Sequence, residues 1–307
     1  MQNRPERERD MLAHLVARYG AAPPGQIWAG DDAALVAALS RPLISTDLVV
    51  EGVHVDRRFC AFADMGFKAV SVNVSDIAAM GGEPRAIVVA IAGATGAEIR
   101  EIMRGAEEAA NRYGCDIVGG DLTNSATLVI SVTALGECVN QPIRRSGARV
   151  GDIVYVTGPL GASSAGLREL RKDPTAASPC VEAYRRPVAR TAEGLLLGAI
   201  GAHAAVDCSD GLANAVHLLA QCSGLRIVLE SLPAADGATR KDVLEGGEDY
   251  ELVFSLSEVF AITDRFVANG FGAPIRVGTV ASGPAFVEFE GGALESRGFE
   301  HHLGAIQ

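Results

Sequence analysis

The sequence has no apolar run long enough to cross a bilayer as a helix, and runs such as Ala86–Ala92 are far too short. Its first ten residues carry charges where a signal peptide would need an apolar core. From these two absences we expect a cytoplasmic protein with no membrane partner.

Positive charge is also scarce. Over 307 residues the formal net charge is -11, and basic residues form only short pairs such as Arg57-Arg58 and Arg144-Arg145. Nonspecific nucleic-acid binding needs a positive surface to meet phosphates, so the sequence argues against a nucleic-acid partner. Phosphorylated small molecules fit this acidity if divalent cations bridge them to carboxylates, which indicates magnesium.

Paired cysteines and several catalytic motifs are missing as well. The six cysteines lie far apart, without the Cys-x-x-Cys spacing of zinc or redox sites. We expect most of them to be buried small hydrophobes, and a catalytic thiol at Cys208 is disfavoured. The chain has no P-loop, no kinase-like His-Arg-Asp or Asp-Phe-Gly motif and no Gly-x-Ser-x-Gly elbow, which excludes those enzyme classes.

The length and composition are those of a globular protein with two domains. Hydrophobic residues make up 48% and charged residues 21% of the chain. The polar stretch 140–151, with one proline and two glycines, predicts a boundary between domains at 1–140 and 141–307. Periodicity predicts helices over 6–19, 64–80, 96–113 and 190–200, and strands over 42–50, 85–92, 115–119, 127–138, 152–157, 204–206 and 252–256.

The most informative stretch is Asn73–Gly81, which carries Asp76 in an otherwise small and apolar helix. A lone buried charge is too costly, so Asp76 must be paired, hydrogen-bonded or bound to metal. A satisfied structural aspartate is the plain alternative. Four further segments place aspartates beside Gly, Ser or Thr at expected strand ends or helix starts: Gly30-Asp31-Asp32, Ser45-Thr46-Asp47, Gly119-Gly120-Asp121 and Asp207-Cys208-Ser209-Asp210.

Scattered aspartates next to glycines are typical of a site for several magnesium ions that neutralise nucleotide phosphates during phosphoryl transfer. Plainer interpretations exist for some members. Helix capping explains part of Asp207–Gly211, although two aspartates exceed what a cap needs. Glu248 and Asp249 fit turn positions, and Trp28 fits a packing role. A lone histidine is more often structural, but His54 adjoins an aspartate-bearing strand, which favours a functional role.

Eight motifs in order resemble the thiamine-monophosphate kinase family from about residue 28 to residue 302. Each is short, but the ordered set is specific. The motifs are Gly30–Asp32, Ser45–Asp47, Glu51–His54, Asn73–Gly81, Gly119–Asp121, Arg145–Ala148, Asp207–Gly211 and Gly247–Leu252.

The resemblance implies an α+β (mixed α/β) fold of two domains, shared with aminoimidazole-ribonucleotide synthetase. Its N-terminal domain has a mixed sheet flanked by helices, binds metal and ATP and pairs in a homodimer, and its C-terminal α/β sandwich completes the nucleotide and substrate site. The implied reaction is direct in-line transfer of the ATP γ-phosphate to thiamine monophosphate, with several Mg2+ ions and no residue acting as acid or base.

The resemblance also implies residue roles. Magnesium ligands would be Asp31, Ser45, Thr46, Asp47, Asp76, Asp121, Asp207 and Asp210. ATP would contact Tyr113, Gly120, Asp121, Arg145 and Ser209. The thiamine phosphate site would contain His54, Glu248 and Phe299.

Three positions depart from the family pattern. Leu122 and Asn124 stand where the family commonly has Thr and Arg, and Ala215 stands where it usually has an aspartate. These departures leave open another ATP-using enzyme of the same superfamily with a different phosphorylated substrate. A catalytically silent nucleotide-binding protein is the second alternative, and the retained aspartates argue against it.

Overall fold

A computed structural model describes residues 7–257, 261–296 and 298–299. The chain divides into two compact units. Unit 1 comprises Met1–Ile77 and Gly82–Val139, and unit 2 comprises Ala78–Gly81 and Asn140–Gln307. No helix of the described part of the chain is long and apolar enough to cross a membrane.

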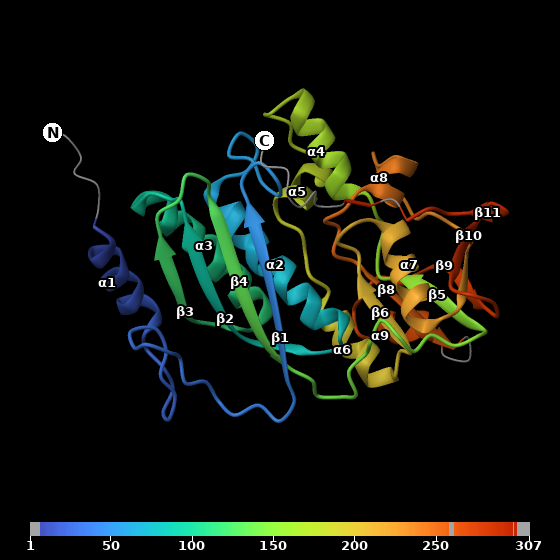
Figure 1. Cartoon of the computed structure of the whole chain (residues 1–307), viewed down its shortest axis with the longest axis horizontal. Helices are drawn as coiled ribbons and strands as arrows, with labels where there is room; N and C mark the ends of the chain where they lie inside the picture. The colour runs from blue at the N-terminus through green and yellow to red at the C-terminus, as the bar shows by residue number, and fades with distance from the viewer. Residues whose placement is uncertain (1–6, 258–260, 297, 300–307) are drawn as a thin grey trace. The chain divides into compact units, whose positions relative to one another are not determined.

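Unit 1 is built on a four-stranded mixed sheet in the order β1-β4-β2-β3. Strand β3 runs parallel to β2, and the other neighbours are antiparallel. Helices α2 and α3 cover one face of the sheet, and α1 lies beside its β3 edge (Figure 1). The bounds are α1 (Glu8–Tyr19), β1 (Pro42–Val50), α2 (Phe62–Ala79), β2 (Glu83–Ala92), α3 (Gly96–Tyr113), β3 (Asp116–Thr123) and β4 (Val129–Glu137).

Helices α2 and α3 pack closely because glycines face backbone at their contact. A Cβ at Gly66 would collide with the Ile102 carbonyl oxygen, and one at Gly105 would collide with that of Ala63. Local sequence also defines the ends of α3. Thr95 and Glu98 form a capping box at its start, and Gly114 ends it in the left-handed conformation with φ of 68°.

Unit 2 is built on a seven-stranded mixed sheet in the order β11-β10-β7-β9-β5-β8-β6. Only the β10–β7 pair among the described strands of this sheet is parallel. The bounds are β5 (Asp152–Val156), α4 (Ala162–Lys172), α5 (Pro179–Arg185), α6 (Thr191–Ile200), β6 (Ala204–Asp207), α7 (Leu212–Ser223), β7 (Arg226–Leu229), α8 (Arg240–Glu245), β8 (Leu252–Ser257), α9 (Ile262–Ala268), β9 (Ile275–Ala281), β10 (Phe286–Phe289) and β11 (Gly292–Ala293).

The predicted fold class is confirmed, since both units are mixed α and β structures with mixed sheets. The predicted strand ends need correction. Asp121 lies inside β3, which continues to Thr123, and Ser45–Asp47 lie in the middle of β1. Pairing with β2 extends β3 past its two glycines, which single-strand propensity disfavours. The short elements α5, β7, α8 and β11 were not predicted.

Candidate active site

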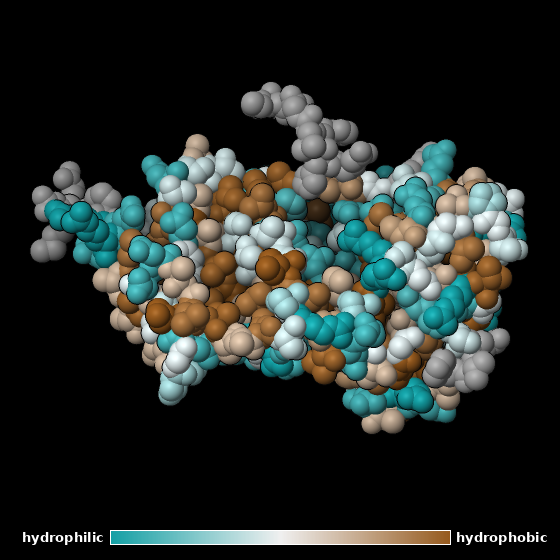
Figure 2. All heavy atoms as spheres, turned by 60° about the horizontal axis from the view of Figure 1, so that its bottom comes forward, coloured by the Kyte–Doolittle hydropathy of each residue, from teal (hydrophilic) through white to brown (hydrophobic). Residues whose placement is uncertain are grey.

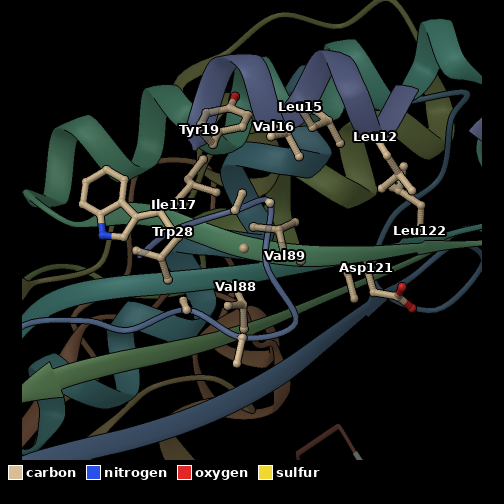
Figure 3. Close-up of a pocket in the computed structure, with 18 of the residues that line it drawn as sticks. Leu12, Leu15, Val16, Tyr19, Trp28, Val88, Val89, Ile117, Asp121 and Leu122 are labelled. Atoms are coloured by element: carbon tan, nitrogen blue, oxygen red, sulfur yellow. The ribbon is translucent and has the colours of Figure 1, made fainter. Parts of the chain in front are cut away.

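A pocket of about 540 Å3 lies in unit 1 between α1, the 28–34 loop and strands β2, β3 and β4. Two of the predicted motifs meet there, because Gly30–Asp32 and Gly119–Asp121 both line it. Figure 3 shows Tyr19 and Trp28 at one end and the Asp121 carboxylate at the other. The volume is within the usual range for small-molecule sites. Unit 1 alone therefore forms a pocket with an apolar wall and an acidic end.

Glycine is needed at the floor of this pocket. A Cβ at Gly120 would collide with the carbonyl oxygen of Val89 on the neighbouring strand. Gly120 therefore lets β3 lie against β2 and keeps its backbone accessible beside Asp121, whose side chain is exposed. Leu122, one of the departures from the family pattern, lies below Leu12 of α1 and completes the apolar wall (Figure 3).

Strand alternation divides the Ser45–Asp47 motif between two faces of the sheet. The Thr133 hydroxyl lines the pocket and donates a hydrogen bond of 3.1 Å to Thr46 Oγ1, so Thr46 is next to the pocket. The Ser45 hydroxyl instead donates to the Asp76 carboxylate on α2. The partner that Asp76 requires is thus Ser45, itself a predicted magnesium ligand. Asp47 lies on the same side of β1 as Ser45.

His54 lies in the turn that follows β1. The backbone N–H of Val50 donates to His54 Nδ1 at 3.2 Å, which makes Nδ1 the acceptor and places the ring proton on Nε2. The backbone N–H of His54 donates to the Val50 carbonyl at 2.9 Å, which closes the turn. His54 is partly buried, and its neutral ring carries the N–H on Nε2.

Tyr113 is placed away from the pocket. Its side chain is buried at the end of α3, and its hydroxyl lies 2.9 Å from that of Ser71 on α2. In the described structure this contact ties α2 to α3. The assignment of Tyr113 to ATP stays a prediction.

In unit 2, the chain folds the segments 207–211 and 244–251 against each other. The backbone N–H of Glu248 donates to the Ser209 carbonyl at 2.7 Å, and that of Cys208 donates to the Glu251 carbonyl at 2.8 Å. Gly211, with φ of 95°, faces the carbonyls of Leu244 and Gly246 so closely that a side chain would not fit. Asp207, Ser209, Asp210 and Glu248 are therefore neighbours.

The end of the described chain reaches the same group. Gly298 lies so close to the Asp210 carbonyl that a Cβ there would collide with it, and this places Phe299 next to Asp210. Asn214 donates to Asp210 Oδ2 at 3.2 Å. Ala215, where the family usually has an aspartate, is buried in the apolar core of unit 2. Burial also raises the pKa of the Cys208 thiol well above its usual value, which disfavours a catalytic thiolate there.

Arg145 lies elsewhere in unit 2. The Ser223 hydroxyl, at the C-terminal end of α7, donates to the Arg145 carbonyl at 3.5 Å. Ser209 and Asp210 precede the N-terminus of the same helix, whose 12 residues span about 18 Å. The structure thus does not bring Arg145 beside Ser209, and a shared role in ATP binding stays a prediction.

Asp249 turns out to cap a helix. Its carboxylate accepts the backbone N–H groups of Gly161 at 2.6 Å and Ser163 at 3.2 Å, at the start of α4. Desolvation nevertheless raises the pKa of Asp249 to about 6. The turn assignment from sequence was incomplete, because the partner backbone lies 88 residues away.

A raised carboxyl pKa predicts a pH-dependent stability. Because the folded state binds the Asp249 proton more tightly than an unfolded chain with a pKa near 3.8, stability conferred by protonation is lost as pH rises through about 6. We expect the free energy of unfolding of the wild type to fall by about 1–3 kcal/mol more than that of Asp249→Asn between pH 4 and 7. Urea denaturation across this range measures the difference, and parallel pH profiles would contradict it.

The donor chemistry fits magnesium. The candidate side chains are carboxylates and hydroxyls, the hard oxygen ligands that Mg2+ accepts. Within the described residues, no three His, Cys, Asp or Glu side chains lie together as a ready cation site. Magnesium is usually held by one or two carboxylates together with substrate phosphates and water, so this arrangement suits an ion that arrives with a nucleotide.

Both halves of the chain match models of known protein domains. The models for the N-terminal and C-terminal domains of AIR synthase related proteins match residues 30–138 and 149–286, so the chain is an AIR synthase related protein. It is 37% identical to thiamine-monophosphate kinase of Bacillus subtilis over 271 residues, 81% of this chain and 83% of that protein. It is 35% identical to the Mycobacterium tuberculosis enzyme of the same name over 85% of this chain and 81% of that protein. The chain belongs to the thiamine-monophosphate kinase family.

Solved structures of thiamine-monophosphate kinases share the fold of this chain. Thiamine-monophosphate kinase from Stenotrophomonas maltophilia has a TM-score of 0.79 at 30% identity, covering 93% of this chain and 96% of that one. A structure described as AaThiL complexed with AMPPCP and TMP has a TM-score of 0.77 at 30% identity, covering 96% and 97%. Hydrogenase maturation protein HypE in complex with ATP, at 20% identity and a TM-score of 0.75 over 94% and 95%, shares the fold alone.

Proposed function

We propose that the chain transfers the γ-phosphate of ATP to thiamine monophosphate and forms thiamine diphosphate and ADP, the last step of thiamine diphosphate biosynthesis. An oxygen of the acceptor phosphate bonds to the γ-phosphorus while the bond from that phosphorus to the β–γ bridging oxygen breaks. The observation that carries the proposal is the meeting of Asp31 and Asp121 at one pocket, in a chain that belongs to this kinase family.

The acceptor phosphate is already ionised at neutral pH, so the reaction needs no strong general base. Catalysis then depends on positioning the two phosphates in line and on neutralising their charge. A site of carboxylates, hydroxyls and glycine backbone, without an activated nucleophile, suits that task.

The residue roles form part of the proposal. Mg2+ would supply charge neutralisation between the phosphates when bound. Its ligands are Asp31, Ser45, Thr46, Asp47, Asp76, Asp121, Asp207 and Asp210. ATP contacts Tyr113, Gly120, Asp121, Arg145 and Ser209, and thiamine monophosphate contacts His54, Glu248 and Phe299.

The domain roles follow from these residues. Residues 1–140 bind metal and ATP, and residues 141–307 complete the nucleotide and substrate site. In this arrangement His54 donates a hydrogen bond from Nε2 to the acceptor, because its Nδ1 already accepts the Val50 N–H.

The working form is a cytoplasmic homodimer that pairs through the uncovered face of the unit 1 sheet. Ile44 and Leu48 of β1 are 73% and 53% exposed on that face. Figure 2 shows apolar side chains gathered on the surface of this part of the molecule. An exposed apolar sheet face of this kind is typical of a surface that another protein covers.

Steady-state ADP release with a panel of acceptors tests the proposal against another ATP-using enzyme of the superfamily. We expect ADP release with thiamine monophosphate, little with thiamine or with other phosphate monoesters, and loss of the activity on chelation with EDTA. Release that depends on a different phosphorylated acceptor would favour the alternative.

A further inference from the structure

Lys68 on α2 is completely buried, with 0% of its surface exposed. Lysine is almost never fully buried, because its ammonium loses hydration in a protein interior. A methionine would fill a similar volume without that cost. A specific interaction of the ammonium is therefore the physical reason for a lysine at this position.

The ammonium reaches the turn that carries His54. Lys68 Nζ donates a hydrogen bond of 3.3 Å to the backbone carbonyl of His54. The turn itself is closed by Gly52 N–H donating to the Val55 carbonyl at 2.8 Å, with Gly52 at a φ of 83°. The hydrogen bond from Lys68 attaches this turn to helix α2 as well.

Helix α2 thus holds the β1 segment at two points. Asp76 accepts a hydrogen bond from Ser45 in the middle of β1, and Lys68, two turns earlier on the helix, binds the His54 carbonyl beyond its end. The helix is rigid and largely buried, so it fixes the distance between the two points. The Val50 N–H then sets the direction of the imidazole through Nδ1.

We propose that Lys68 is a positioning residue for the acceptor phosphate: its buried ammonium fixes the Val50–Val55 turn so that His54 Nε2–H points at thiamine monophosphate. This inference rests on the proposed function. Lys68 does not touch the substrate, and it acts only through the orientation of His54.

The test is a double-mutant cycle of Lys68→Met and His54→Ala, with the acceptor and ATP varied separately. We expect Lys68→Met to raise the KM for thiamine monophosphate about tenfold and to leave the KM for ATP within about twofold, because a small misplacement of a binding group is costly. On the His54→Ala background, Lys68→Met should change the KM by less than about twofold, since its effect passes through His54.

A purely structural role predicts different results. Lys68→Met would then lower activity toward both substrates alike, and its effect would add to that of His54→Ala. Val72→Ala, a buried change one turn along the same helix, is the matched control and should leave both KM values unchanged. If Lys68→Met does not fold, Lys68→Gln, which keeps an N–H donor, should fold and give an intermediate KM for the acceptor.

Each outcome is decisive. Additive effects, or equal changes in the two KM values, would overturn the role of Lys68 while leaving the kinase assignment intact. A wild-type protein that makes no thiamine diphosphate would overturn the proposed function itself. Nitrogen NMR of His54 gives a second readout, in which the wild type shows a proton on Nε2 and the Lys68→Met variant shows a mixture of tautomers.

Discussion

Replacing Asp76 by asparagine is expected to lower kcat by about 1,000-fold while leaving the fold intact. The carboxylate is a proposed magnesium ligand. Without its negative charge, the Mg2+ that neutralises the phosphates would be bound more weakly. Asparagine keeps an acceptor oxygen for the Ser45 hydroxyl, so the contact between α2 and β1 survives. Steady-state kinetics and circular dichroism measure the two effects.

Asp116→Asn is the matched control for this substitution. Asp116 is an exposed aspartate at the start of β3, five residues before Asp121, and no proposed role falls on it. The same loss of one charge there should leave kcat within about twofold of the wild type. A kcat of Asp76→Asn close to that of Asp116→Asn would remove Asp76 from the metal site.

Replacing Gly105 by alanine is expected to destabilise unit 1 by about 3 kcal/mol. Alanine normally stabilises a helix interior by about 1 kcal/mol over glycine. At Gly105, however, the new methyl group would overlap the Ala63 carbonyl oxygen and force α2 and α3 apart. Since α2 carries both Asp76 and Lys68, activity should fall together with stability.

The same substitution at Gly198 separates crowding from helix propensity. Gly198 also lies inside a helix, α6, but the nearest atom to an added Cβ is the Gly81 carbonyl oxygen at 3.3 Å. Because the gain in helix propensity opposes this one tight contact, we expect Gly198→Ala to change stability by no more than about 1 kcal/mol in either direction. Urea denaturation compares the two variants, and equal stabilities would show that the α2–α3 contact tolerates a methyl group.

Much of the fold and part of the site follow from local sequence. Apolar periodicity predicted α2 and α3 closely. Asp76 was also expected to need a partner, and this partly buried carboxylate accepts a hydrogen bond from the Ser45 hydroxyl. The ordered motifs identified the family before any geometry was known. The helical periodicity and each single motif lie within short stretches of the sequence.

What sequence could not predict depends on contacts between distant segments. The meeting of Asp31 with Asp121 requires the β2–β3 pairing and the 28–34 loop together. The capping of α4 by Asp249 spans 88 residues. Lys68 did leave a signal, a single lysine inside a helix of mostly small and apolar residues, but the His54 carbonyl that it binds lies in a turn 14 residues earlier.

The most direct test of the account is chromatographic identification of the product formed from thiamine monophosphate, ATP and magnesium. The account predicts thiamine diphosphate and ADP in equal amounts, with none formed after chelation. Magnesium-dependent ATP binding without thiamine diphosphate would contradict it, because the scaffold would then serve another phosphate acceptor.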